Sequence, residues 1–294
     1  MSGLNLFLMQ FLNGVNIGSI YALIALGYTM VYGIAKLINF AHGDIIMVGA
    51  YVSLVCLNGG MPWWLACIVS IVCCALFGVV MEKLAYKPLR KASRISLLIT
   101  AIGISYFLEN LFQLIFTPNP QPYPSFIKLP PLVLGSLTIS ANYYITFLVS
   151  VTLMIVLHLF VKKTSMGKAM RAVSEDEGAA RLMGINVDTT ISLTFAIGSA
   201  LAAIAGILYS NCYSPINPTM GSLPGIKAFI AAVLGGIGSI PGAVIGAFIL
   251  GMIEAMTKAY ISSQLLDTIV FALLIIILVL KPAGILGRNV KEKV

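Results

Sequence analysis

The chain alternates between long apolar runs and short basic segments, and this alternation restricts its fold more than any other feature. Of its 18 lysines and arginines, 14 fall within three windows: residues 83–94, 162–181 and 281–293. Basic clusters that border apolar runs mark the cytoplasmic side of a membrane protein. Because 59% of the residues are hydrophobic and only 10% are charged, the chain cannot cover itself with a water-compatible surface. The net charge of +8 therefore indicates membrane orientation, and we expect no nucleic-acid partner.

The apolar runs have the length of membrane helices. A helix that crosses the bilayer needs about 20 mainly apolar residues. The runs that reach or approach this length are 7–35, 40–57, 63–81, 95–117, 141–161, 189–211, 225–257 and 265–280. None of them alternates between apolar and polar residues as a barrel strand would. The sequence predicts an all-α fold: one domain over residues 1–294, a polytopic membrane helical bundle of about 8–9 transmembrane segments.

A glycine-rich break interrupts the run at 225–257. The segment GGIGSIPG at 235–242 predicts a broken region near 225–246 where two half-helices meet. Broken helices at membrane depth line cavities or pack against protein, because lipid cannot satisfy the freed backbone groups. Gly238, Gly242 and Gly246 are spaced by four, which would place them on one helix face. They could pack the subunit tightly or line a translocation path, and the spacing alone favours neither.

Several polar side chains lie within the apolar runs, where burial in lipid is costly unless they face protein or a cavity. Glu109 has no basic residue near it in the sequence, so it is a candidate for the translocation path. Glu254 and Lys258 are four residues apart and could pair on a helix. His42 and Asp44 begin the second run and suggest a cap or a hydrogen-bonded bend between the first two helices.

Residues 162–188 form the longest polar segment, and its basic residues place it in the cytoplasm. Acidic residues up to Glu177 favour the start of a helix, and Gly184 can end one in a left-handed conformation. We therefore predict a short helix outside the membrane over residues 175–184. Its small residues Ala179 and Ala180 could enter a groove of a partner. The alternative is a solvated connector.

Some functional motifs are absent from the sequence. It has no G-x-x-x-x-G-K-[ST] phosphate-binding loop, so we expect no ATP hydrolysis by this chain. Its two histidines, His42 and His158, have no partners at the spacing of a metal site or a catalytic triad. We predict no metal site, no cofactor and no enzymatic activity.

Four segments carry a resemblance to a known family: 18–51 (GSIYALIALGYTMVYGIAKLINFAHGDIIMVGAY), 88–94 (PLRKASR), 98–105 (LITAIGIS) and 227–254 (KAFIAAVLGGIGSIPGAVIGAFILGMIE). They resemble the H-type membrane subunit of the branched-chain amino-acid ABC importers, and the resemblance extends over essentially the whole chain. The pattern A-A-x-x-x-G at 179–184 also resembles the EAA loop with which ABC importer permeases dock on their ATPases, although Gly178 separates Glu177 from Ala179.

The resemblance implies a permease in a bacterial inner membrane that imports leucine, isoleucine or valine. It implies a second permease subunit of related fold, two cytoplasmic ATPase subunits and an extracytoplasmic substrate-binding protein. Residues 162–188 would be the coupling loop, with Glu177, Ala179, Ala180 and Gly184 at the ATPase. Similar permeases move urea or short amides. A different class also fits the residues: a self-sufficient secondary transporter or channel that uses Glu109 for ion coupling.

Overall fold

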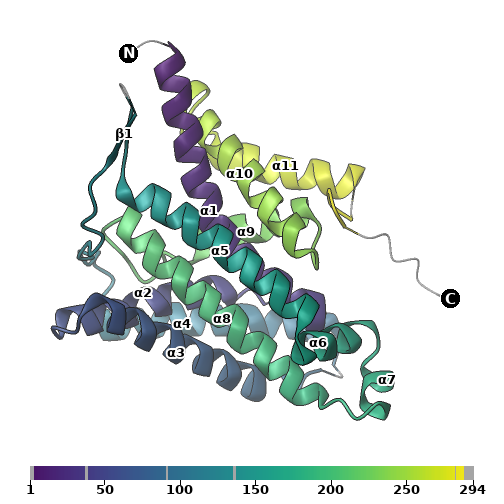
Figure 1. Ribbon diagram of the computed structural model, residues 1–294. Coiled ribbons are helices and arrows are strands. Elements are labelled where there is room, and N and C mark those ends of the chain that lie inside the picture. The colour runs from purple at the N-terminus through teal and green to yellow at the C-terminus, as the bar shows by residue number, and fades with distance from the viewer. Residues whose placement is uncertain (1–2, 37–38, 91, 135–136, 282, 288–294) are drawn as a thin grey trace.

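The structure is a computed structural model that describes residues 3–36, 39–90, 92–134, 137–281 and 283–287. Most of these residues are helical (Figure 1). The helices are α1 (Gly3–Ala35), α2 (His42–Asn58), α3 (Trp63–Met81), the π-helical turn η1 (Glu82–Tyr86), α4 (Arg94–Phe116), α5 (Ala141–Lys163), α6 (Ser165–Glu175), α7 (Glu177–Leu182), α8 (Val187–Cys212), α9 (Ser222–Gly235), α10 (Ile240–Tyr260) and α11 (Leu266–Leu280). The strands β1 (Leu132–Leu134) and β2 (Leu137–Ile139) form an antiparallel hairpin.

Six helices in the described ranges are long and apolar enough to cross a membrane: α1, α3 with η1, α4, α5, α8 and α10. The helices α2, α9 and α11 are apolar but shorter. Together these helices correspond to the predicted runs, with the run at 225–257 divided between α9 and α10. The all-α membrane bundle is therefore confirmed. The β1–β2 hairpin was not predicted, because three-residue strands leave almost no periodic signal.

Helix α1 lies at the centre of the bundle, in contact with α5, α8, α9 and α10. Its contact with α10 is close because small residues meet there. Gly14 lies against the backbone of Met252, and Gly18 lies against the backbone of Phe248. From Gly14 to Gly18 the chain number rises along α1, while the contacts move from Met252 back to Phe248 on α10. The two helices therefore run antiparallel. Small residues at such a seam let two backbones approach closely in lipid.

The described parts of the basic windows lie at one end of the bundle, and residues 288–293 of the last window lie outside the described residues. The side chains of Lys87 and Arg90 bind Asp188 at the start of α8, at 2.8 and 2.6 Å. Lys162 and Arg171 line a common cavity with Leu286, which follows the last helix. This is the end that carries α6 and α7 in Figure 1. The arrangement agrees with a single cytoplasmic end.

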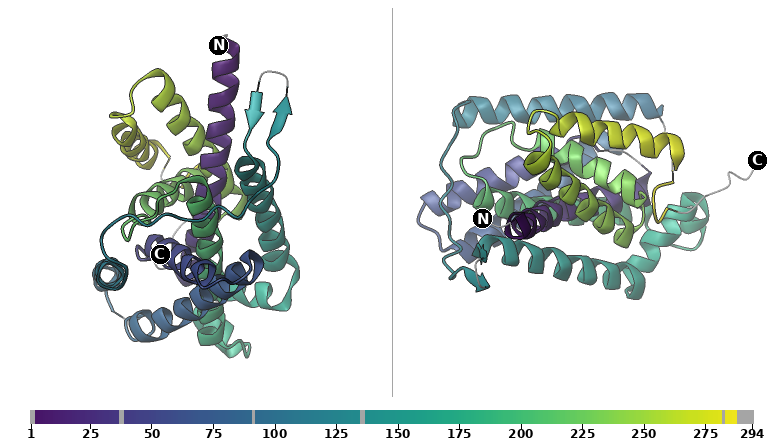
Figure 2. Two further views of the ribbon diagram at one scale, coloured as in Figure 1. Left: turned by 90° about the vertical axis from the view of Figure 1, so that its left-hand side faces the viewer. Right: turned by 90° about the horizontal axis from the view of Figure 1, so that it is seen from above.

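The opposite end is built from loops and the hairpin. Gln121 forms a bridge with Ile216, and the ring of Trp63 stacks on Phe126 with centroids 5.7 Å apart. Both contacts hold the proline-rich loop at 117–131, between α4 and β1, against the bundle. The left view of Figure 2 shows the hairpin beside the amino-terminal end of α1, in line with the contact between β2 and α1. This end lies opposite to α6 and α7 (Figure 1).

The break predicted at 225–246 is present but differs from two half-helices. A turn at residues 236–239 joins α9 to α10, and Gly236 and Gly238 adopt positive φ values of 105° and 93°. Glycine adopts such values without steric cost. Helix α10 has 21 residues, about 31 Å of helix, which is enough to cross the membrane. Only α9 is short.

The predicted common face of the three glycines is also wrong in part. Gly238 lies in the turn, before α10 begins. Gly242 and Gly246 lie on α10 and pack against α9: a Cβ atom on Gly246 would approach the carbonyl oxygen of Ala231 to 2.1 Å. Their spacing serves close packing within this chain.

Candidate functional site

An ion-pair network, buried at Lys227, largely buried at Glu254 and half-exposed at Asp267, joins α1, α9, α10 and α11. Lys227 on α9 is only 7% exposed. Its Nζ atom lies 3.1 Å from Glu254 Oε1 on α10 and 2.9 Å from Asp267 Oδ1 on α11. The Tyr21 hydroxyl of α1 donates a hydrogen bond of 2.8 Å to the other Glu254 oxygen. Since an unpaired charge in this environment would cost several kcal/mol, the network fixes these four helices relative to one another.

The sequence did not identify this network. The spacing of Glu254 and Lys258 allowed a pair between them, but Glu254 pairs with Lys227, which is 27 residues away. The sequence nevertheless contained a signal for this network. Lys227 and Lys258 are two of the four basic residues outside the three basic windows, and a lysine within an apolar run requires an acidic partner.

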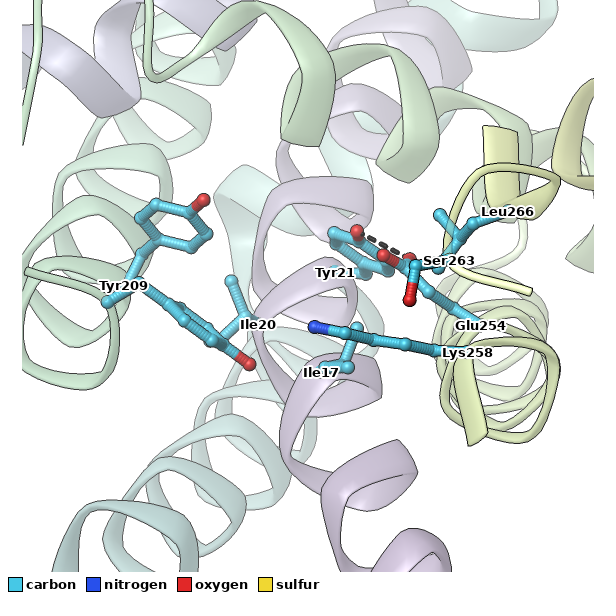
Figure 3. Close-up of a pocket in the computed structure, with 9 residues that line it drawn as sticks. Ile17, Ile20, Tyr21, Tyr209, Glu254, Lys258, Ser263 and Leu266 are labelled. Carbon is cyan, nitrogen blue, oxygen red and sulfur yellow. Dashed lines mark hydrogen bonds between the residues drawn. The ribbon is translucent and has the colours of Figure 1, made fainter. Parts of the chain in front are cut away.

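A pocket of about 280 Å³ lies beside the network (Figure 3). Its lining residues are Ile17, Ile20, Tyr21, Tyr209, Tyr213, Glu254, Lys258, Ser263 and Leu266. The Lys258 side chain extends from α10 toward Ile17 on α1. Among the described residues, Lys258 has no hydrogen-bond or ion-pair partner. The pocket therefore combines a free ammonium group and a fixed carboxylate with an apolar wall.

The pocket lies toward the end of the bundle that is opposite to α6 and α7. Tyr213 directly follows the last residue of α8, which begins at the basic end with Asp188. Ser263 follows α10, whose first residues lie near the turn at 236–239. Both elements thus reach the pocket at their ends that point away from α6 and α7.

A second polar cluster lies at the start of α9. The Ser222 hydroxyl donates a hydrogen bond to Glu109 on α4. Asp44 on α2 is buried and lies within electrostatic range of Glu109 and beside the Ser105 hydroxyl. The start of α9 is inserted deeply, because Gly221 packs directly on the backbone of Gly43. Glu109 thus faces the positive end of a helix dipole, which stabilises a carboxylate.

Of the two alternatives expected at the start of α2, the cap is not formed, whereas the His42 side chain lies within hydrogen-bonding range of the Ile24 backbone on α1. Ala41 is the N-cap residue, and no side chain caps the helix there. His42 is buried and packs edge-on against Tyr28, with ring centroids 4.7 Å apart. Asp44 lies in the first turn of α2, next to the cluster at α9.

The polar segment at 162–188 contains the predicted short helix, α7. The side chain of Asp176 caps it by accepting a hydrogen bond of 2.9 Å from the Ala179 amide. Gly184 ends it with φ 80°. The amide of Gly184 donates to the Arg181 carbonyl, and the amide of Ile185 donates to the Ala180 carbonyl, both at 3.0 Å. This pair of bonds is a Schellman motif. The helix and its glycine cap are confirmed.

Exposure along α7 differs from the expected pattern. Ala180 is only 3% exposed and packs within this chain, whereas Ala179 is exposed. The large apolar residues at the end of the helix are exposed instead: Leu182 by 90% and Met183 by 81%. Sequence reasoning missed both. Adjacent exposed apolar side chains on a polar segment are typical of a contact with another protein.

Comparisons with known proteins identify the family. Residues 10–279 match the family described as the permease component of branched-chain amino acid transport systems. This chain belongs to that family. It is 46% identical to the high-affinity branched-chain amino acid transport system permease proteins LivH of Salmonella typhimurium and Escherichia coli K12, over 98% of this chain and 98% of each relative. It is 42% identical to the corresponding protein BraD of Pseudomonas aeruginosa, again over 98% of both chains.

Membership in this family favours one of the two classes that the sequence left open. The chain is a multi-pass membrane permease and one component of a transport system that has other subunits. The relatives are permease proteins of transport systems. A self-sufficient secondary transporter or channel is not favoured.

Proposed function

We propose that this permease is the membrane-spanning subunit of an ABC importer for branched-chain amino acids in a bacterial inner membrane. The observation that carries the proposal is the 46% identity to LivH over 98% of both chains. ATP is hydrolysed by partner subunits, in keeping with the missing phosphate-binding loop. The partners are a second permease of related fold, two cytoplasmic ATPase subunits and an extracytoplasmic substrate-binding protein.

The coupling contact to the ATPase lies in residues 162–188. Its surface consists of Glu177, Ala179, Leu182, Met183 and Gly184, which are all exposed. The buried Ala180 supports this surface from behind. Apolar side chains of this size can anchor a helix in a groove of a partner.

The loop is connected mechanically to the bundle. Helix α6 contacts α1, α5 and α8. It packs closely on the end of α5, since a Cβ atom on Gly167 would approach the carbonyl oxygens of Phe160 and Val161 to 2.4 Å each. The Thr164 side chain caps α6 by accepting a hydrogen bond of 3.0 Å from the Gly167 amide. Movement of α7 with an ATPase would therefore move three membrane helices.

The translocation path passes the start of α9, beside Glu109. A short helix that begins within the bundle offers dipoles to a zwitterion without adding net charge. Gly242 and Gly246 keep α9 against α10, and Gly238 permits the turn between them. These glycines shape the wall of the path.

The proposal is tested by transport in proteoliposomes. The permease is reconstituted with its partner permease, ATPases and binding protein. Uptake of labelled leucine, isoleucine and valine is measured with ATP or a non-hydrolysable analogue inside the vesicles. We expect uptake only with ATP, and no competition by urea or acetamide. Leucine uptake driven by a proton or sodium gradient without ATP would overturn the proposal, and uptake of urea instead of leucine would overturn its substrate.

A further inference from the structure

We infer that the pocket between α1, α8 and α10 is an entry site that holds the amino acid as a zwitterion. In this site Lys258 binds the α-carboxylate, Glu254 binds the α-ammonium group, and the apolar wall receives the side chain. The inference rests on the proposed function, which supplies the class of substrate. It adds a location within this chain and a role for named residues.

The charges in and around the pocket balance only if Lys258 is included. Glu254 and Asp267 carry two negative charges, and Lys227 neutralises one of them at distances of 3.1 and 2.9 Å. Lys258 supplies the second positive charge and remains without a partner in the described ranges. A zwitterion can therefore enter without changing the net charge, whereas an acidic or a basic amino acid would leave one charge uncompensated.

Glu254 keeps the capacity to bind an ammonium group. One of its oxygens accepts from Lys227 and the other accepts from Tyr21. A carboxylate has about four acceptor positions, so each oxygen can accept one more hydrogen bond. The two existing partners hold the carboxylate in place before any ligand arrives, which lowers the entropic cost of binding. Glu254 and Lys258 are one helical turn apart on α10, about 6 Å along its axis.

The rest of the pocket suits a branched aliphatic side chain. Ile17, Ile20 and Leu266 contribute aliphatic surface, and Tyr209 contributes an aromatic ring (Figure 3). The pocket volume of about 280 Å³ leaves room for a ligand of the size of leucine beside these side chains.

The test measures ligand binding to the purified importer in lipid nanodiscs without its binding protein. Saturation-transfer NMR is recorded with three probes. Leucine carries both charges, leucinamide lacks the carboxylate, and 4-methyl-2-oxopentanoate lacks the ammonium group. The variants are Lys258→Met, which removes the free charge, and Ile17→Trp, which fills the pocket. The matched controls are Lys128→Met, at an exposed lysine in the external loop, and Ile204→Trp, in a separate apolar groove.

Wild type should bind leucine more tightly than either analogue. Lys258→Met should weaken leucine binding about tenfold or more, as expected for loss of a hydrogen bond to a charged group, and should leave leucinamide binding unchanged. Ile17→Trp should abolish binding of leucine, and the two control variants should bind it as wild type does. Equal affinity of wild type for leucine and leucinamide, or equal behaviour of Lys258→Met and Lys128→Met, would overturn the inference.

The same preparation separates this inference from the proposed function. If wild type does not bind leucine in nanodiscs but the complete importer accumulates leucine with ATP, the entry site is refuted and the proposed function stands. If the complete importer does not accumulate branched-chain amino acids, the proposed function is refuted, whatever the binding experiment shows.

Discussion

Helices α1 and α4 have the same hydropathy but different surroundings. Their most apolar windows both have a mean hydropathy of 1.6, yet 83% of the window in α1 is buried and only 17% of the window in α4. Figure 2 shows α1 surrounded by other helices, which the contacts of α1 with α5, α8, α9 and α10 support. Hydropathy therefore accounts for insertion into the membrane but not for the position of a helix in the bundle.

Glycine explains the difference. In α1, Gly14 and Gly18 lie against the backbone of α10, and Gly27 lies against His42. In α4 the single glycine, Gly103, has no atom within 4 Å of its Cβ position. Lipid tails are as apolar as leucine, so helices in a membrane associate through close packing and polar contacts. Helix α1 offers small residues for such packing, and α4 offers large ones to lipid.

The largest effect is expected at the seam between α1 and α10. A Cβ atom on Gly251 would lie 2.4 Å from the Gly18 amide nitrogen. Gly251→Val should therefore destabilise the folded permease by about 3 kcal/mol or more, because both backbones are in contact and neither can move locally. Gly103→Val, on α4, should stay within about 0.5 kcal/mol of wild type. Thermal unfolding in detergent measures both, and equal stabilities would refute the role assigned to the seam.

The buried and the exposed lysine give the next comparison. Lys227→Met leaves Glu254 without its cation, so we expect a loss of about 3 kcal/mol or more in the free energy of unfolding. Lys258→Met removes a charge without a protein partner and should change stability by less than about 0.5 kcal/mol. Chemical denaturation of the two variants provides the measurement. Adding Glu254→Gln to Lys227→Met should restore part of the stability, and failure to do so would mean that the ion pair is not the cause.

Two adjacent alanines in α7 give a third comparison between a buried and an exposed residue, here outside the membrane helices. Ala180 is buried and Ala179 is exposed. Ala180→Glu should destabilise the cytoplasmic segment by about 2 kcal/mol, since it buries a charge, and proteolysis between residues 162 and 188 should accelerate. Ala179→Glu should leave protease resistance unchanged but reduce the stimulation of ATP hydrolysis by loaded binding protein. If both variants retain full stimulation, the segment is only a connector.

The smallest effect is expected at Glu109. Glutamine keeps an acceptor for the Ser222 hydroxyl, and transport that is driven by ATP does not require a titratable group there. Glu109→Gln should therefore keep leucine uptake within about twofold of wild type, which is less than 0.5 kcal/mol in the barrier. Uptake with and without a proton gradient tests this, and loss of both uptake and gradient dependence would favour ion coupling.

Local features were predictable where neighbouring residues decide them. The acidic start and Gly184 specified α7 and its cap, because both act within one helical turn. The glycines at 235–238 specified the break after α9 in the same way. The cap by His42 and Asp44, one of two alternatives, is not formed, because the buried surroundings of these side chains come from α1 and α4. The exposed pair Leu182 and Met183 was missed, since nothing in the sequence separates exposed from buried residues in such a short helix.

The sequence by itself determined the order of the apolar helices and the family, and its basic windows predict which end is cytoplasmic. Transfer into lipid depends on composition over about 20 residues, and orientation depends on basic residues next to the helices. Only the tertiary structure decided which helix is central, that Lys227 rather than Lys258 pairs with Glu254, and where a pocket remains. These features depend on distances between atoms from α1, α8, α9, α10 and α11. Such distances follow from how closely small residues let the backbones approach, which no single segment encodes.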